Sequence, residues 1–143
     1  MQITNRKAHF NYTIEEEIEA GIILLGSEVK SLRKGSANIN DAYIAEKNGE
    51  IFLINSHISK YEGANKFNHE ERRLRKLLLK NKQIQKLVGK LQEKAYSAFP
   101  LKIYFTRGFA KVMIGVGRGK KLYDKRETIK KRDENRRKQR GEE

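Results

Sequence analysis

Two stretches of the chain alternate hydrophobic and polar residues in the manner of hairpin strands. In "DAYIAEKNGEIFLINSHI", Asn48-Gly49 is the dipeptide that type I′ turns favour, and it separates two runs rich in strand-forming residues. After Pro100, a second alternation turns at Arg107-Gly108. Its hydrophobic positions are Leu101, Ile103 and Phe105 before the turn and Val112, Ile114 and Val116 after it. The sequence therefore predicts two β-hairpins.

The N-terminal part also favours strands, although one segment is ambiguous. In "HFNYTI" every second residue is hydrophobic, namely Phe10, Tyr12 and Ile14. In the following "TIEEEIEAGIILLG", Thr13 and Glu16 could form the capping box of a helix. The apolar run "IILLG" instead favours a buried strand, with a bulge near Glu17–Glu19.

Two segments predict helices. "SEVKSLRKG" has Ser27 as a candidate N-cap, two hydrophobic residues on one face and Gly35 as a C-terminal stop. A longer helix is predicted over "NHEERRLRKLLLKNKQIQKLVGKLQEKAY", where Asn68 and Glu71 could cap the start. Hydrophobic residues follow at helical spacing: Leu74, Leu77, Leu78, Ile84, Leu87, Val88 and Leu91.

The expected fold is mainly β. A small OB-like β-barrel with flanking helices best accommodates several short strands around one long helix. A two-layer α+β sandwich is the alternative. The length of 143 residues suits one domain. We expect the barrel in residues 1–116 and a basic C-terminal tail in residues 117–143.

The tail has little apolar material with which to fold. Its acid-before-base pairs at i, i+4 are weak, at roughly 0.2–0.5 kcal/mol each, and no apolar stripe accompanies them. A short isolated helix is marginal in water. We therefore expect a tail that is disordered alone and conditionally helical against a polyanion.

The charge points to the class of partner. The chain carries a net charge of +14, with 32 Lys and Arg. From Gly117 onward there are 12 Lys and Arg against 6 Asp and Glu, a net +6, which leaves +8 for residues 1–116. A charge this large attracts polyanions, with nucleic acid first and an anionic membrane surface second. The sequence contains no long apolar span or secretory signal, and it has no cysteine, which fits a reducing cytoplasm.

Candidate RNA contacts concentrate in the predicted long helix. After acids in its first turn, cations surround its polar side, as expected of phosphate contacts: Arg72, Arg73, Arg75, Lys76 and Lys80. His9, beside Arg6 and Lys7, is placed to touch a phosphate or stack on a base. Glu15–Glu17 and Glu19 suit a solvated strand edge that resists aggregation, or else carboxylates that accept hydrogen bonds from a base or ribose. The strand-edge interpretation is favoured for these acids.

Two other motifs carry little chemistry. "GVGRGKK" lacks the spacing of a Walker or dinucleotide loop, which leaves a flexible exit from a strand whose amides and lysines could touch a phosphate. His9, His57 and His69 have no metal-ligand spacing. We expect no metal, cofactor or catalytic residue, and hence no enzyme.

The chain resembles the SmpB family of SsrA-binding proteins over roughly residues 5–140. The motifs "NRKAHFNY", "EAGIILLGSEVKSLRKG", "NINDAYI", "GEIFLINSHI", "RRLRKLLLK" and "KVMIGVGRGKKLYDKR" occur in the family's order. The resemblance implies an OB-like adaptor that binds the tRNA-like domain of transfer-messenger RNA and brings it to stalled ribosomes. In trans-translation that RNA tags the stalled peptide. The tail is then expected to sense the empty mRNA channel of the small subunit.

The resemblance also implies site residues. The RNA-binding surface should include Asn5, Arg6, Lys7, His9, Glu19, Leu78, Lys80 and Lys111, so Glu19 is expected to touch RNA after all. Lys80 stands where many relatives carry Asn or His. The positions expected to act in decoding are Gly119, Lys120, Lys121, Tyr123, Asp124, Lys125 and Arg126. Tyr123 could stack on an exposed base.

The resemblance and the charge together imply a monomer in the cytoplasm whose partners are transfer-messenger RNA and ribosomal RNA, without a membrane. A general OB-fold translation factor or ribosomal RNA-binding protein is the alternative. A nuclease that uses His9 or His57 is a third hypothesis.

Overall fold

The computed structural model describes residues 2–63, 68–120, 126 and 129–133. In chain order, the elements are β1 (Gln2–Thr4), α1 (Ala8–Asn11), β2 (Tyr12–Ile22), α2 (Gly26–Arg33), β3 (Ala37–Asn38), β4 (Tyr43–Lys47), β5 (Glu50–Ile54), β6 (His57–Ile58), β7 (Arg75–Leu78), α3 (Asn81–Leu91), β8 (Tyr96–Thr106) and β9 (Phe109–Gly119). Arg126 and residues 129–133 are helical. No helix among the described residues is long and apolar enough to cross a membrane.

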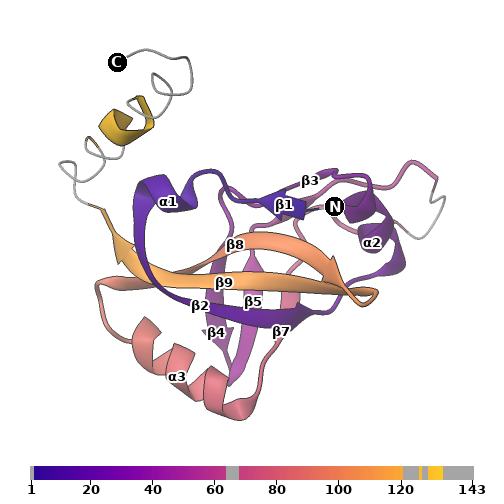
Figure 1. Ribbon diagram of the computed structural model, residues 1–143. Coiled ribbons are helices and arrows are strands. Elements are labelled where there is room, and N and C mark those ends of the chain that lie inside the picture. Colours follow the sequence, from indigo (N-terminus) through magenta and orange to yellow (C-terminus); the bar gives the residue numbers. More distant parts are fainter. Residues whose placement is uncertain (1, 64–67, 121–125, 127–128, 134–143) are drawn as a thin grey trace.

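Seven strands form one antiparallel sheet in the order β1-β8-β9-β2-β7-β5-β4. In Figure 1, β8, β9 and β2 run side by side in front, with β4 and β5 behind them and α3 below. The sheet curls until its edge strand β4 approaches β8, and β3 and β6 form a separate pair. The prediction of a mainly β, OB-like barrel with flanking helices is confirmed.

The interior of the barrel is one apolar core to which most strands and two of the helices contribute. Its most buried members include Leu32, Leu53, Leu87, Ile103 and Ile114. A second, smaller cluster lies where α1 packs on β8, with Ala8, Phe99 and Leu101 at its centre. There the rings of Tyr12 and Phe99 stack with centroids 4.2 Å apart. This second cluster fixes α1 to the barrel.

Both predicted hairpins are present. Asn48 and Gly49 both have positive φ, as a type I′ turn requires, between β4 and β5. Arg107 and Gly108 do the same between β8 and β9. The second hairpin begins earlier than predicted, because β8 starts at Tyr96 and includes Pro100 beside a bulge.

The predicted strand over "HFNYTI" is partly wrong. Phe10 lies in α1, and the strand begins only at Tyr12. Asn5 starts this helical turn, since its side-chain oxygen accepts from the Lys7 amide at 3.1 Å. From Tyr12 the strand interpretation of the ambiguous segment is confirmed, but the irregularity lies between Ile14 and Glu16 rather than near Glu17–Glu19. The strand also ends at Ile22, so Ile23 and Leu25 are exposed.

The predicted long helix is wrong in its first half. Residues 75–78 form β7, and only Asn81–Leu91 is helical. Within β7, Arg75 and Leu77 point inward while Leu78 points outward, which is the alternation of a strand. Arg75 hid this pattern, because a buried arginine occupies an inward position that usually carries an apolar residue. The cations 72–76 therefore do not line the polar side of a helix.

The shorter helix is confirmed as α2, with a different start. Gly35, at φ +74°, ends it as predicted. At the other end, Glu28 accepts from the Leu25 amide at 2.7 Å. The predicted N-cap, Ser27, lies inside the helix and pairs its hydroxyl with His69 at 2.8 Å.

The glycine run belongs to the sheet. Gly117 lies within β9, opposite Ile14 and Ser97. A Cβ at Gly117 would stand 2.1 Å from the Thr13 carbonyl oxygen, so no larger residue fits without displacing the backbone. The interpretation of this run as a flexible exit is therefore wrong up to Gly119. The boundary between barrel and tail at 116/117 stays a prediction.

Candidate RNA-binding surface

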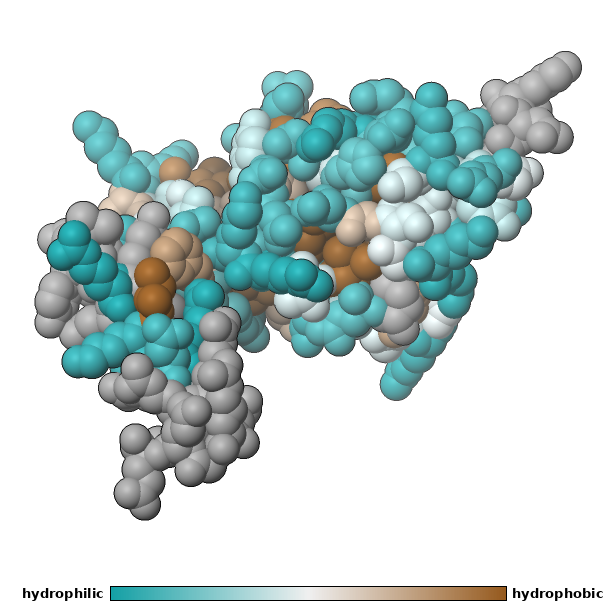
Figure 2. All heavy atoms as spheres, turned by 90° about the horizontal axis from the view of Figure 1, so that it is seen from above, coloured by the Kyte–Doolittle hydropathy of each residue, from teal (hydrophilic) through white to brown (hydrophobic). Residues whose placement is uncertain are grey.

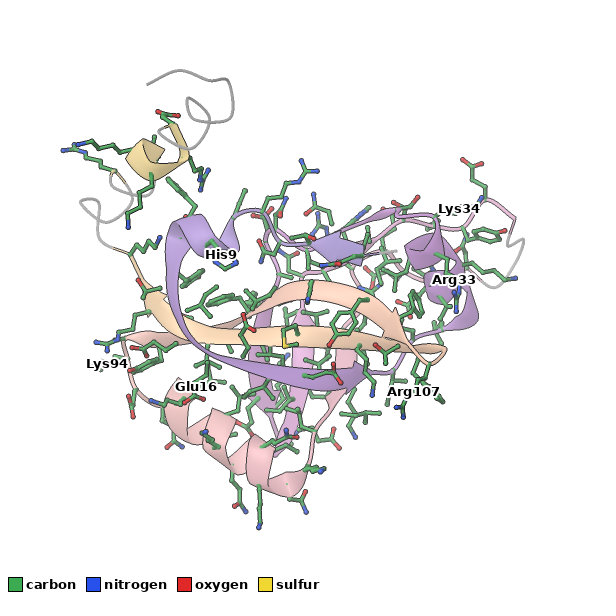
Figure 3. All side chains as sticks on the ribbon, in the orientation of Figure 1. His9, Glu16, Arg33, Lys34, Lys94 and Arg107 are labelled. Atoms are coloured by element: carbon green, nitrogen blue, oxygen red, sulfur yellow. The ribbon has the colours of Figure 1, made fainter. Side chains whose placement is uncertain are left out.

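Three of the predicted RNA contacts converge on the outer surface of the sheet. Strand pairing sets Leu78 opposite Gly21, Gly21 opposite Lys111, and Lys111 opposite Tyr104. At about 4.8 Å between neighbouring strands, this row spans roughly 14 Å. Glu19, two residues before Gly21 on β2, lies on the same side of the sheet. We call this surface, built from Glu19, Leu78, Tyr104 and Lys111, the front face; three of its strands, β2, β8 and β9, lie in front in Figure 3.

Gly21 gives the front face its shape. A Cβ at this position would lie 3.3 Å from the Cβ of Leu78, closer than such atoms usually pack, so a larger residue would crowd the leucine side chain. Leu78 therefore leans across the glycine toward β9, yet its side chain is still 50% exposed. An exposed apolar side chain beside a lysine can pack against a ribose or a base.

Glu19 and Tyr104 form a hydrogen-bonded pair on the front face. The Tyr104 hydroxyl donates to Glu19 Oε2. Burial, this hydrogen bond and the charge of Glu19 together raise the pKa of Tyr104 to about 12. The tyrosine therefore stays neutral, and the carboxylate keeps acceptor capacity for a base or a 2′-hydroxyl. Sequence reasoning missed Tyr104, because its outward place in the alternation before Arg107 gave no sign of its partner on β2.

Lys111 is a half-buried cation of this surface. Among the described residues, no ion pair holds its ammonium group, whereas Lys102 on the neighbouring strand lies over the Tyr104 ring at 5.3 Å. A lysine without a carboxylate partner can reach a phosphate without first breaking an ion pair. The front face thus combines a free cation, an acceptor and an apolar side chain.

Arg75 is the clearest correction to the predicted surface. Its side chain is fully buried, and its Nε donates to Glu28 Oε2 at 2.5 Å. Arg73 donates to the other oxygen of the same carboxylate at 2.6 Å. Burial would raise the pKa of Glu28, but the hydrogen bonds from Arg73 and the Leu25 amide and the charge of Arg75 lower it overall. Arg75 therefore ties β7 to α2 and cannot reach a phosphate in this fold.

The other cations of that segment are partly engaged. Arg72 donates to the Asn55 side chain at 2.8 Å, and Lys76 pairs with Glu50 at 3.0 Å. Lys80 is exposed, and its backbone amide donates to Gln83 at the start of α3. These three lie near the surface, but they do not form the cationic helix face that the sequence suggested.

The predicted N-terminal contacts gather at a separate place, which we call the α1 end (Arg6, Lys7 and His9). Figure 3 shows His9 and Arg107 at opposite ends of the β8–β9 hairpin. Lys7 pairs with Asp41 at 3.2 Å, and both side chains are more than half exposed. Asn5 is buried: its side chain donates to the Pro100 carbonyl at 2.8 Å, so it holds the chain in place rather than facing a ligand.

A cleft of about 540 Å³ opens beside α1, between β4 and β8. Its walls are polar and apolar in about equal measure, and the polar ones include Lys7, Asn11, Asp41 and Tyr43. The face that carries α1, β1 and α2 is largely hydrophilic, with apolar atoms showing in small areas between the polar ones (Figure 2). The α1 end is thus a polar, partly cationic surface.

The tail leaves the barrel at the α1 end. The Lys120 amide donates to the Asn11 carbonyl at 2.8 Å, directly beyond Gly119. Farther along, the Arg132 guanidinium lies 5.4 Å from the centre of the Phe10 ring. Four of the positions expected to act in decoding, Lys121, Tyr123, Asp124 and Lys125, lie outside the described residues. Gly119, Lys120 and Arg126 are described, and the first two sit next to α1.

Two of the three histidines, His57 and His69, form hydrogen bonds with neighbouring residues. His57 bonds Glu71 at 2.6 Å, and this hydrogen bond lowers the pKa of Glu71. His69 is buried between the Ser27 hydroxyl and the Ile58 carbonyl, each at 2.8 Å. In the described part of the chain, no cluster of three or more His, Cys, Asp and Glu residues could hold a metal ion.

Comparison with known proteins identifies the family. Residues 2–143 match the family model described as SmpB protein. An SsrA-binding protein of Shouchella clausii is 56% identical over 129 residues, which cover 90% of this chain and 83% of the relative. One from Geobacter sulfurreducens is 55% identical over 132 residues, or 92% and 86% of the two chains.

A solved structure, "tmRNA-SmpB: a journey to the center of the bacterial ribosome", contains a similar chain. The two are 44% identical, each is covered to 85%, and the TM-score is 0.72. Similarity of this extent in sequence and in fold leaves one assignment: the chain belongs to the SmpB family.

Proposed function

We propose that the chain is an RNA-binding adaptor that binds the tRNA-like domain of transfer-messenger RNA and carries it to stalled ribosomes for trans-translation. The observation that supports this most directly is the convergence of Glu19, Leu78 and Lys111 on the front face. Relatives that are more than half identical are SsrA-binding proteins. The similar solved chain belongs to a tmRNA complex on the bacterial ribosome.

The front face suits recognition of RNA by shape. The minor groove of A-form RNA presents 2′-hydroxyls between phosphates, and single-stranded loops expose base edges. Lys111 can neutralise a phosphate, the Glu19 carboxylate can accept from a hydroxyl or an exocyclic amine, and Leu78 can pack against a sugar. Because these groups sit on hydrogen-bonded strands, they are positioned before RNA arrives, which limits the entropy lost on binding.

The resemblance assigned Arg6, Lys7 and His9 to the RNA-binding surface; because they lie apart from the front face, we propose instead that the α1 end faces the ribosome together with the tail. Lys7 and His9 lie on the element where the tail leaves the barrel, so tail and α1 can contact the same RNA. We propose that Gly119 and Lys120 begin a cationic arm that continues with Lys121 and Tyr123–Arg126. This arm enters the vacant mRNA channel and tests whether message is present. Because the arm becomes ordered only where it fits, it binds an empty channel with a more favourable free energy than an occupied one.

We further propose that binding is the whole of the chemistry, so the chain is no enzyme. Both ring nitrogens of His69 are engaged, by the Ser27 hydroxyl and the Ile58 carbonyl, so this histidine is not free to act as a general base. A purified sample incubated with RNA, with and without divalent cations, should leave the RNA intact. Because ribosomes work in the cytoplasm, the proposal includes a cytoplasmic location.

A competition experiment tests the function. Labelled tRNA-like domain is bound to the full chain, and bulk tRNA is added in large excess. The proposal predicts that binding survives, because ordinary tRNA does not reproduce the recognised shape. Equal competition by tRNA would indicate a general translation factor or ribosomal RNA-binding protein instead. Salt must be fixed, since phosphate contacts make affinity strongly salt-dependent.

A further inference from the structure

Phe109 is the most exposed large hydrophobic side chain in the described part of the chain, at 71%. It begins β9, directly after the Arg107-Gly108 turn. Exposing a whole aromatic ring at the tip of a hairpin contributes nothing to the core. The proposed function so far gives this side chain no role.

The register of the hairpin places Phe109 on the front face. Phe109 is opposite Thr106, and Lys111 is opposite Tyr104, without a bulge between the two pairs. Side chains two apart on a strand share a side of the sheet. Ala110 and Val112, which alternate with them, pack against the core. Phe109 is therefore the end of the same row of outward positions that includes Lys111 and Met113.

The charges around Phe109 are mainly positive. Arg107 is exposed at the tip of the turn (Figure 3), and Lys111 is the next outward residue on the strand. Of the exposed acids on β2, Glu19 lies nearest in register to Lys111, and it already accepts from Tyr104. An exposed ring set among cations fits a planar ligand carried on a phosphate backbone better than an apolar protein surface, which would have to bury these charges.

We propose that Phe109 is a stacking platform for an unpaired nucleobase of the RNA that the front face binds, with Arg107 and Lys111 holding the phosphates on either side of that base. The inference rests on the proposed function and extends the binding surface to the tip of the β8–β9 hairpin. The phenyl ring offers a π-face and no hydrogen-bonding group, so it can stack on any base and does not discriminate between bases. The sequence of this nucleotide should matter less than its being unpaired.

Substitutions at Phe109 test the platform through RNA affinity. Base–aromatic stacking corresponds to a loss of roughly 5- to 150-fold in affinity when the ring is removed. Phe109→Ala should therefore weaken binding of the tRNA-like domain by such a factor at fixed salt. Phe109→Trp should restore the affinity because indole also stacks, whereas Phe109→Leu should not, because leucine is apolar without a flat π-face.

Tyr43 provides the matched control. It is an aromatic residue 50% exposed on β4, in the cleft beside α1 and outside the front face. Tyr43→Ala should leave affinity for the tRNA-like domain within about twofold. A fluorescent adenine analogue at unpaired positions of the RNA gives a second readout, because its emission should change when wild type binds and should not change in the same way when Phe109→Ala binds. Urea unfolding of each variant shows whether it is folded.

The outcomes separate the two proposals. If wild type prefers the tRNA-like domain over bulk tRNA and Phe109→Ala binds as well as wild type, the platform is wrong and the function stands. If Phe109→Leu restores full affinity, the contact is apolar packing and the stacking inference is equally wrong. A Phe109→Ala protein with normal RNA affinity but weaker ribosome binding would assign the ring to another partner. If wild type shows no preference at all, the proposed function itself fails.

Discussion

The front face and the α1 end differ in how their side chains are held. Front-face residues project from strands whose positions are fixed by pairing on both sides, and Glu19 and Tyr104 also bond each other. At the α1 end, Arg6, Lys7 and His9 lie in and around a four-residue helix and are exposed to solvent. Along β2, about nine residues lie between Tyr12, which follows α1, and Gly21 in the front face, or roughly 30 Å of extended strand.

This difference suggests two kinds of recognition. A surface fixed by a sheet can discriminate shape, because a ligand that does not fit gains nothing from rearrangement. The cationic α1 end, which is continuous with the tail, can instead adjust its side chains to the surface that it binds. We therefore propose a division of labour in which the front face selects the RNA and the α1 end with the tail engages the ribosome.

Removing the tail should give the largest effect. A chain that ends after Lys120 keeps all of β9 and both hydrophobic clusters. We expect it to bind the tRNA-like domain within about tenfold of the full chain, since a few lost phosphate contacts weaken binding moderately. Peptide tagging on stalled ribosomes in a reconstituted translation system should be abolished. Retained tagging would contradict the role assigned to the tail.

Glu28→Gln should cause the next largest effect, on stability. The substitution leaves Arg75 buried without a counter-charge, which costs about 3–5 kcal/mol. The free energy of unfolding in urea measures this directly. Glu50→Gln is the matched control, because it removes the exposed partner of Lys76 and should cost at most about 1 kcal/mol. Equal effects from the two variants would mean that the buried network does not hold β7.

The same carboxylate predicts acid sensitivity. The pKa of Glu28 is lowered below its ordinary 4.5 in the folded chain. Its contribution to stability is therefore complete above pH 4.5 and is lost as the pH falls through the folded value. Unfolding free energies measured from pH 7 down to pH 3 should decrease in wild type, and less in Glu28→Gln. Parallel curves would assign the acid sensitivity to other groups.

Lysine substitutions on the two regions sharpen the comparison. Lys111→Ala should weaken binding of the tRNA-like domain about tenfold and reduce the salt slope by about one. Lys7→Ala should change neither quantity much, because Lys7 belongs to the α1 end. Filter binding over a series of salt concentrations measures both the affinity and its dependence on salt. If Lys7→Ala reduced affinity as much as Lys111→Ala, the two regions would form one binding surface.

Tyr104 provides the smallest and most local test. Its pKa of about 12 reflects burial, the hydrogen bond to Glu19 and the charge of Glu19. Ultraviolet titration should show one tyrosine ionising near pH 12 in wild type and at a lower pH in Glu19→Ala. The contribution of Tyr104 to the free energy of unfolding is complete below pH 10, and it is lost as the pH rises through 12. An unshifted tyrosine in Glu19→Ala would show that the pair is not formed in solution.

The hairpins and the barrel were predictable because local chemistry determined them. Asn48-Gly49 and Arg107-Gly108 adopt the positive φ that their turns need. β7 could not be predicted in this way, because it is specified by Glu28, which is 47 residues away from Arg75. Without that partner, "RRLRKLLL" has the spacing and the charge of a helix. A long-range ion pair therefore overrode a local pattern.

The site was predictable to a similar extent. Glu19, Leu78 and Lys111 came from a resemblance in sequence, and strand register explains why residues so far apart in the chain share one surface. Asn5 had appeared to be an RNA contact, yet its amide closes a backbone turn. Tyr104 and Phe109 were missed because a residue that alternates outward on a strand gives no sign of its function until its neighbours across the sheet are known.

The most direct test of the division of labour is the affinity of residues 1–120 for the tRNA-like domain, measured at fixed salt with and without excess bulk tRNA. The account predicts that this shortened chain retains the preference of the full chain, within about tenfold in affinity, because selection resides in the front face. Loss of the preference with the tail, or equal competition by tRNA, would contradict it.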